Sequence, residues 1–285
     1  MTLTLKRKAH KEHTDWLALI ILAALTVMVI FPIFWMLRTS LMSNAEVSKY
    51  PPRFLPSKWL FSNYYKTVTT STFKFGLYLV NTLSIAIPSV VGVVITASMA
   101  AYAFARMDFR GKNLLFALCI GSMLMPAAVT IIPIFIMWSR MGFYNTYAPL
   151  IVPQFLGGGA FNIFLIRQFM LGIPRDLDEA GMIDGASHAM ILVRILLPVL
   201  QPALITVGLF SFIMSWNDVL GPVIYLSDAP KYTISLGLAI FKGGYGTNWV
   251  AIMCASTLAV LPALALYIIG QKYFVEGIVL SGLKS

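Results

Sequence analysis

Acidic side chains gather in one short stretch of this sequence. Asp176, Asp178, Glu179 and Asp184 lie within nine consecutive positions, although the whole chain of 285 residues has only 11 acidic residues. Clustered carboxylates can pair with basic groups on a docking surface, or they can cap helix ends as part of a charged interfacial loop. The residues alone leave these two roles open.

A second candidate for chemistry is a lone acid in an otherwise uncharged run, 203–226. Asp218 follows Trp216 and Asn217, and Tyr225 comes soon after. A charge inside a bilayer costs at least about 2.5 kcal/mol, so Asp218 should face a cavity or a partner. Its neighbours could bind sugar hydroxyls and ring faces. We favour a structural role instead, as a helix cap or a bond to another helix, because polar residues often join membrane helices.

Long uncharged runs must position these side chains. Hydrophobic residues make up 59% of the chain and charged residues 11%, against roughly 45–50% and about 25% in a soluble domain. A helix needs about 20 apolar residues to cross a bilayer. We therefore expect an all-α integral membrane protein with six transmembrane helices, at Trp16–Leu37, Gly76–Ala105, Asn113–Trp138, Tyr147–Ile166, Ala203–Leu226 and Trp249–Gly270.

The sequence also argues against several kinds of function. Cys119 and Cys254 both lie inside expected spans, so no disulfide framework is expected. The pattern Gly-x-x-x-x-Gly-Lys-Ser/Thr does not occur, so ATP should not bind to this chain. No histidine has zinc-like neighbours and the spans lack a nucleophile–base pair, so we expect neither a metal site nor an enzyme. The net charge of +10 fits membrane orientation and does not indicate nucleic acid.

Positive charge near the helix ends sets the expected topology. Basic residues in the N-terminal tail and in the short loop 106–112 favour the cytoplasm for both segments. With six spans, both termini then lie in the cytoplasm. The expected parts are a cytoplasmic tail 1–15, a membrane domain 16–275 that includes the outer loops 38–75 and 227–248, and a cytoplasmic tail 276–285.

The acidic stretch has an expected shape of its own. The proline that opens the segment 174–198 fits a helix entry, and Asp176 three residues before Glu179 resembles a capping box. Gly185 tolerates backbone angles that other residues avoid, and Asp184 can cap the run that follows it. We therefore expect a helix, a tight bend and a second helix on the cytoplasmic side.

The same segment carries a pattern of known spacing. The pattern is Glu179-Ala180-Gly181, then three residues, Gly185, nine residues, Ile195, one residue and Leu197-Pro198. This spacing resembles the permease subunits of bacterial ABC importers, where the first three positions read Glu-Ala-Ala. The glycine in place of the second alanine is a small-for-small change, which should loosen the helical turn without blocking a contact.

Four further stretches resemble the maltose-type carbohydrate importers, and in particular the second permease of their heterodimeric channel. These stretches are "PIFWMLRTSL" at 32–41, "SNYY" at 62–65, "SWNDVLGPVIYL" at 215–226 and "QKYFVEGIVLSGLKS" at 271–285. Because they follow one another in order along six expected spans, the resemblance covers nearly the whole chain.

The resemblance implies a type I ABC importer permease fold in a bacterial cytoplasmic membrane. It implies that the chain forms half of a sugar pathway, with no cofactor of its own. The implied partners are a second homologous permease, an extracytoplasmic sugar-binding protein and two cytoplasmic ATPase subunits, which bind ATP and Mg²⁺. The C-terminal stretch "LSGLKS" resembles the segment that reaches between those ATPase subunits.

The resemblance also assigns site residues. The coupling helix that seats in a cleft of the ATPase would comprise Glu179, Ala180, Gly181, Ile183, Asp184, Gly185, Ala186, Ile195, Leu197 and Pro198. A loop that probes the binding protein would be tipped by Lys242, Gly243, Gly244, Tyr245 and Gly246.

The main alternative is an ion-coupled secondary transporter. Six spans and one intramembrane acid could couple ions to a substrate. The sequence has no inverted repeat, and its acid lies at a helix end, so we favour the importer.

Overall fold

The computed structural model describes residues 16–70, 73–243 and 248–282, and the expected tail 1–15 lies outside them. Within these residues every regular element is a helix, which confirms the all-α prediction. The first part of the chain forms α1 (Trp16–Ser40), α2 (Asn44–Val47), α3 (Ser62–Thr69), α4 (Phe75–Arg106), α5 (Lys112–Gly121), the 3₁₀ turn η1 (Ser122–Leu124), α6 (Ala127–Arg140), α7 (Ala148–Ile151) and η2 (Val152–Phe155). The second part forms α8 (Ala160–Leu171), α9 (Asp176–Ile183), α10 (His188–Met190), the π-helical η3 (Ile191–Leu196), α11 (Leu197–Val199), α12 (Gln201–Asn217), α13 (Leu220–Tyr225), η4 (Ala229–Lys231), α14 (Ile234–Gly243) and α15 (Trp249–Gly282).

The described residues contain four to six helices that could cross a membrane. Four are long and apolar enough alone, at Trp16–Ser40, Phe75–Arg106, Ala148–Leu171 and Trp249–Gln271. Two bent pairs raise the number to six if each counts as one span. The first pair, Lys112–Leu124 with Ala127–Arg140, bends by 99°, and the second, His188–Val199 with Gln201–Asn217, bends by 83°.

Three of the expected spans are therefore not continuous helices. Tyr147–Ile166 is divided into α7, η2 and α8, with a turn before α8 in which Gly157, Gly158 and Gly159 have positive φ. Asn113–Trp138 breaks at Pro126, which has no N–H to donate and forces Met125 into an extended conformation with ψ 120°. Ala203–Leu226 breaks at Asp218, which is also extended with ψ 120°, so α12 ends at Asn217. The apolar runs predict the lengths of these spans but not the positions at which the helices break.

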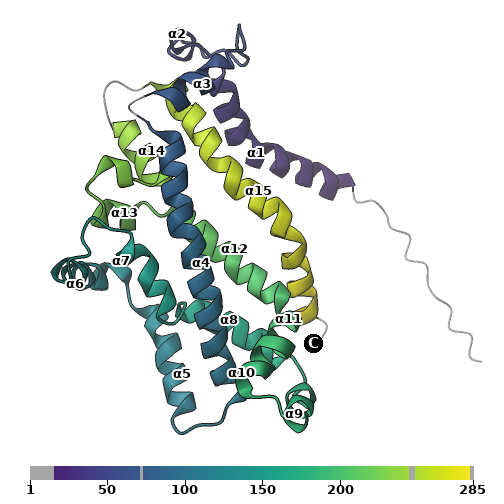
Figure 1. Cartoon of the computed structure of the whole chain (residues 1–285). Helices are drawn as coiled ribbons and strands as arrows, with labels where there is room; N and C mark the ends of the chain where they lie inside the picture. Colours follow the sequence, from purple (N-terminus) through teal and green to yellow (C-terminus); the bar gives the residue numbers. More distant parts are fainter. Residues whose placement is uncertain (1–15, 71–72, 244–247, 283–285) are drawn as a thin grey trace, which may run out of the picture.

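Helix α4 forms the centre of the molecule (Figure 1), with α8 and α12 packed against it. Its lower half shares a core with α8, η3 and α12, in which Ala101, Ile166 and Leu196 are fully buried. Its upper half shares a second core with α12, α14 and α15, around Phe73 and Ala255. This long helix therefore links the two ends of the protein.

The end opposite α9 holds the segments expected as outer loops (Figure 1). In 38–75, the Asn63 amide donates to the carbonyls of Ser40 and Met42 at 2.9 and 2.8 Å, which fixes α3 against the end of α1. The segment 227–248 differs from a plain loop because it includes η4 and α14. The tail expected from 276 differs as well, since α15 continues to Gly282.

Candidate functional site

The acidic stretch forms the lowest point of the view in Figure 1, together with the turn between α4 and α5. Helix α9 ends at Ile183, and Gly185 takes a φ of +80° before α10 and η3 begin. Only glycine adopts this angle without strain, apart from occasional Asn or Asp. The predicted helix, bend and helix are therefore confirmed.

The predicted caps of these two helices are wrong. Asp176 is the first residue of α9, and no side chain caps that helix. The second run is capped by Ser187, whose hydroxyl accepts from the Met190 N–H at 3.3 Å. Asp184 instead ends α9, since its own N–H donates to the Ala180 carbonyl. Ser187 caps the run because it is the extended residue immediately before it.

The four carboxylates do not act as one exposed cluster. Asp178 is buried, with its Oδ2 atom 3.1 Å from the Nε of Arg106, the last residue of α4. The same guanidinium donates from Nη2 to the Ile173 carbonyl at 2.9 Å. Neither Asp178 oxygen accepts a hydrogen bond from the described residues, so charge attraction to Arg106 is its main compensation. The ion pair joins α9 to α4.

A second polar contact lies beside this ion pair. The Tyr102 hydroxyl, one helical turn earlier on α4, lies 2.9 Å from Nδ1 of His188 on α10. Helix α4 therefore meets the acidic element through two side-chain contacts. The sequence analysis missed both, although Asp178 shares a helix face with Gly181 and so could have been assigned to the inner side.

The bend between α9 and α10 is the exposed part of the element. Ile183 is 86% exposed, and Met182, Asp184 and Gly185 are exposed beside it. An apolar side chain next to a carboxylate on a protruding turn can fill a cleft of another protein and pair with its cations. This surface is suited to docking.

The inner face of α9 rests on η3 through a glycine. A Cβ at Gly181 would lie 2.8 Å from Cδ1 of Ile195, so glycine lets the two segments approach closely. The other residues assigned from the resemblance divide by exposure. Glu179, Ala180 and Pro198 are exposed, while Ala186, Ile195 and Leu197 pack against the lower core.

A cavity of about 960 Å³ lies between α4, η2, α8 and α12. Its lining includes Ser89, Gln154, Asn162, Asn217 and Asp218. Close packing at one edge depends on Gly158, at φ +68°, where a Cβ would lie 2.7 Å from the Val93 carbonyl. Helix α4 forms one wall of the cavity, and the far end of the same helix contacts α9.

The structure separates the four residues singled out around Asp218. The Oδ1 atom of Asp218 accepts from the Gly221 N–H in the first turn of α13 at 3.0 Å, while the residue also lines the cavity beside Asn217. Trp216 is 2% exposed and donates from its indole to the Ala259 carbonyl at 3.1 Å, so it packs against α15 instead. Tyr225 is buried against Phe135, away from the cavity lining.

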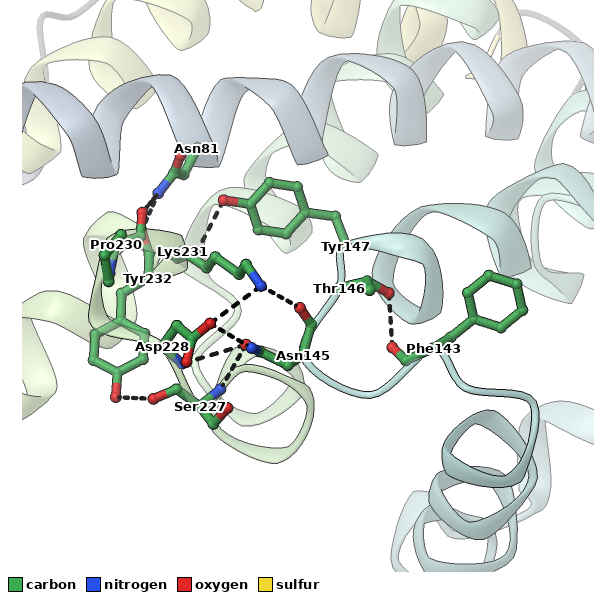
Figure 2. A network of polar contacts seen from close by, with 10 residues as sticks. All are labelled: Asn81, Phe143, Asn145, Thr146, Tyr147, Ser227, Asp228, Pro230, Lys231 and Tyr232. Carbon is green, nitrogen blue, oxygen red and sulfur yellow. Dashed lines mark hydrogen bonds and ion pairs between the residues drawn. The ribbon is translucent and has the colours of Figure 1, made fainter.

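Figure 2 shows a polar network that we call the outer clasp and define as Asn145, Asp228 and Lys231. The Asn145 amide donates to the Asp228 carboxylate and its Oδ1 accepts from the Ser227 N–H at 3.1 Å. Lys231 lies 3.2 Å from Asp228 and donates to the Asn145 carbonyl at 2.9 Å. The clasp joins the segment after α6 to the segment after α13.

The conformation of Asn145 makes this network possible. Its φ is +58°, an angle that asparagine tolerates better than most side chains. Hydrogen bonding from the Asn145 amide, followed by Lys231, lowers the pKa of Asp228. The sequence signal for this site was weak, because the two segments are far apart in the chain.

The residues expected to probe a binding protein begin in the last turn of α14. Lys242 and Gly243 belong to the end of that helix. Gly244, Tyr245 and Gly246 lie outside the described residues.

Comparison with known sequences places the chain beside membrane transport components. The family described as binding-protein-dependent transport system inner membrane component matches residues 92–279. A putative ABC transporter permease protein, ORF2, from Caldicellulosiruptor sp. is 35% identical over 274 residues, covering 96% of this chain and 98% of the relative. The trehalose/maltose transport system permease protein MalG of Thermococcus litoralis is 31% identical over 274 residues, covering 93% and 96%.

The fold also matches a solved structure. A chain from the crystal structure of a bacterial ABC transporter that imports the acidic polysaccharide alginate superposes with a TM-score of 0.82 at 22% identity. The match covers 96% of this chain and all of that one. The type I ABC importer fold expected from the resemblance is confirmed.

Proposed function

Because the chain belongs to the family of binding-protein-dependent transport system inner membrane components, we propose that it is a permease subunit of an ATP-driven sugar importer. It pairs with a second, homologous permease, receives sugar from an extracytoplasmic binding protein, and is driven by two cytoplasmic ATPase subunits that bind ATP and Mg²⁺. The Thermococcus relative is named as a trehalose/maltose transport system permease, which supports a saccharide as the transported solute.

One observation carries the coupling part of the proposal. The exposed turn at Ile183 is joined through α9 to the end of α4 by the buried pair of Asp178 and Arg106. A membrane subunit that is driven by a cytoplasmic ATPase needs an exposed surface on which the ATPase can dock. That surface must also be connected firmly to a membrane helix. We assign this turn to the ATPase cleft, with the carboxylates of Glu179 and Asp184 facing cations of the ATPase.

The geometry supports a route from ATP hydrolysis to the pathway. Closure of the ATPase dimer displaces α9, and the ion pair carries this displacement to Arg106. Helix α4 is continuous from Phe75 to Arg106 and lines the cavity through Ser89 and Val93. Movement at its lower end therefore changes the walls of the cavity, which we assign as this chain's half of the sugar path.

The orientation follows from the same assignment. The end that bears α9 faces the cytoplasm, and the outer clasp faces the opposite side, where the binding protein docks. The protein then lies in a bacterial cytoplasmic membrane with both termini inside. Asn217 and Asp218 belong to the sugar path, while Trp216 and Tyr225 are assigned to packing.

The test is to purify the chain with the products of its neighbouring genes in nanodiscs. ATP hydrolysis is measured with and without the binding protein and a panel of sugars that includes trehalose, maltotriose and arabinotriose. Stimulation by one sugar supports the proposal. A chain that purifies alone and moves solute down an ion gradient without ATP contradicts it and favours the secondary transporter.

A pair of variants tests the docking turn. Gly185→Trp should leave the complex in the membrane but abolish sugar-stimulated ATP hydrolysis, because its side chain blocks the approach of the ATPase. Gly185→Asn is the matched control, since asparagine tolerates the positive φ without the bulk. Normal stimulation in the Trp variant would exclude this turn as the coupling surface.

A further inference from the structure

The polar groups around the cavity retain unused hydrogen-bonding capacity. Asn162 and Asn217 each donate from Nδ2 to a backbone carbonyl, of Gly158 at 2.7 Å and of Ile213 at 3.0 Å, which leaves their Oδ1 atoms as acceptors. Gln154 lines the cavity, and its side-chain amide has no partner among the residues that the structure describes. Amide groups with open positions can satisfy the hydroxyls of a sugar.

Two aromatic rings complete the lining. Phe161 and Phe210 face the cavity from α8 and α12, with ring centroids 6.3 Å apart at an interplanar angle of 76°. Both side chains are about half exposed, at 47% and 41%. A ring face beside amide groups suits the alternating apolar and hydroxyl surfaces of a pyranose or furanose.

The cavity lining carries charge of one sign only among the described residues. Asp218 is the one charged side chain among the described residues that line the cavity, and lysine, arginine and histidine are absent from that set. A carboxylate in the cavity wall repels a nearby anion more strongly than it would in bulk water, because the effective dielectric constant beside the protein is lower. Discrimination between ligands often rests on such a repulsive element.

We infer that this cavity takes an uncharged oligosaccharide and discriminates against anionic sugars, with Gln154 and Asn162 contacting the sugar and Asp218 repelling carboxylates. The inference rests on the proposed function, which leaves the charge of the sugar and these two amide contacts unassigned. It makes this chain a determinant of selectivity, in addition to whatever the binding protein selects.

The test compares a neutral sugar with its own oxidised form. The alditols of maltotriose and arabinotriose are each paired with the corresponding aldonate; both forms have an opened terminal ring, and only the aldonate carries a carboxylate. Calorimetry first measures how each sugar binds to the binding protein, so that uptake into proteoliposomes is compared at saturating loaded binding protein. Any remaining preference then belongs to the membrane complex.

The expected result is that the wild-type complex transports the neutral trisaccharide about tenfold faster than its aldonate, a factor that corresponds to about 1.4 kcal/mol. Gln154→Lys and Asp218→Asn should each reduce this ratio severalfold, since one adds a cation and the other removes the anion. Gln168→Lys is the matched control, because Gln168 is exposed on α8 and does not line the cavity, and its ratio should equal that of the wild type.

Two results would overturn the inference while leaving the importer intact. The first is equal uptake of both sugar forms by the wild type. The second is an unchanged ratio in both cavity variants, in complexes shown by co-purification to be assembled, which would mean that the partner permease fills this cavity. If neither form of any sugar is taken up with ATP by the wild type, the proposed function fails as well.

Discussion

At the scale of single residues, the ion pair of Arg106 and Asp178 is the feature with the largest consequences. Both side chains are more than 90% buried. A buried pair is weak evidence for stability, but removal of one partner leaves an uncompensated charge and typically costs about 3–5 kcal/mol. The pair therefore matters both for folding and for the link between α9 and α4.

We predict that Asp178→Asn sharply lowers the yield and thermal stability of the complex, because it leaves the Arg106 charge buried alone. Asp176→Asn, two residues earlier and exposed, should change neither. Exchange of the two charges in Arg106→Asp/Asp178→Arg should restore part of the stability. Thermal unfolding in detergent measures all three variants, and a full loss in the exchanged pair equal to that of Asp178→Asn would contradict a role for their mutual attraction.

At the scale of elements, the outer clasp should respond to acid. The pKa of Asp228 is lowered in the folded protein, first by the Asn145 amide and then by Lys231. A carboxylate whose pKa falls on folding stabilises the folded state above its unfolded pKa, and this contribution is lost as the pH drops through the lowered pKa.

We therefore predict that Asp228→Asn reduces the melting temperature at pH 7, and that its difference from the wild type shrinks as the pH falls below about 4, near the unperturbed value for aspartate. Asp108→Asn, an exposed aspartate at the other end of α4, provides a control for general acid effects. A difference that stays constant down to pH 3 would show that the ionised form of Asp228 is not what stabilises the clasp.

The elements also differ in how far the sequence could predict them. The span of α4 was expected at Gly76–Ala105 and is found at Phe75–Arg106, because its apolar run is long and unbroken. The structural role favoured for Asp218 is consistent with its position at the end of α12, but the run of apolar residues around it does not by itself reveal where that helix stops. The sequence does not distinguish Asp178 from the other clustered carboxylates, because its partner Arg106 is 72 positions away and only the fold brings the two together.

The sequence predicts only those parts of the site that depend on a local motif. Gly185 was recognised because a bend needs a positive φ, which is a property of one residue. The cavity amides Gln154 and Asn162 were missed, because their role depends on which face of each helix meets α4. Trp216 is only a candidate sugar contact from its neighbours in sequence, and in the fold its indole donates to the Ala259 carbonyl on α15.

At the scale of the whole molecule, α4 connects a docking turn at one end with a cavity wall nearer the other. Its apolar outer surfaces and the exposed apolar side chains of α1 suit lipid or a second permease. The central claim is that force enters this molecule at the α9 turn.

Site-directed cross-linking tests that claim most directly. Ile183→Cys is introduced into the complex after replacement of Cys119 and Cys254. The control is Phe61→Cys, because Phe61 is 68% exposed and lies at the opposite end of the molecule. We predict that a short bifunctional reagent joins Ile183→Cys to an ATPase subunit, with a yield that changes on addition of ATP, and that Phe61→Cys gives no such product. An assembled, active complex in which Ile183→Cys never cross-links to the ATPase would contradict the account.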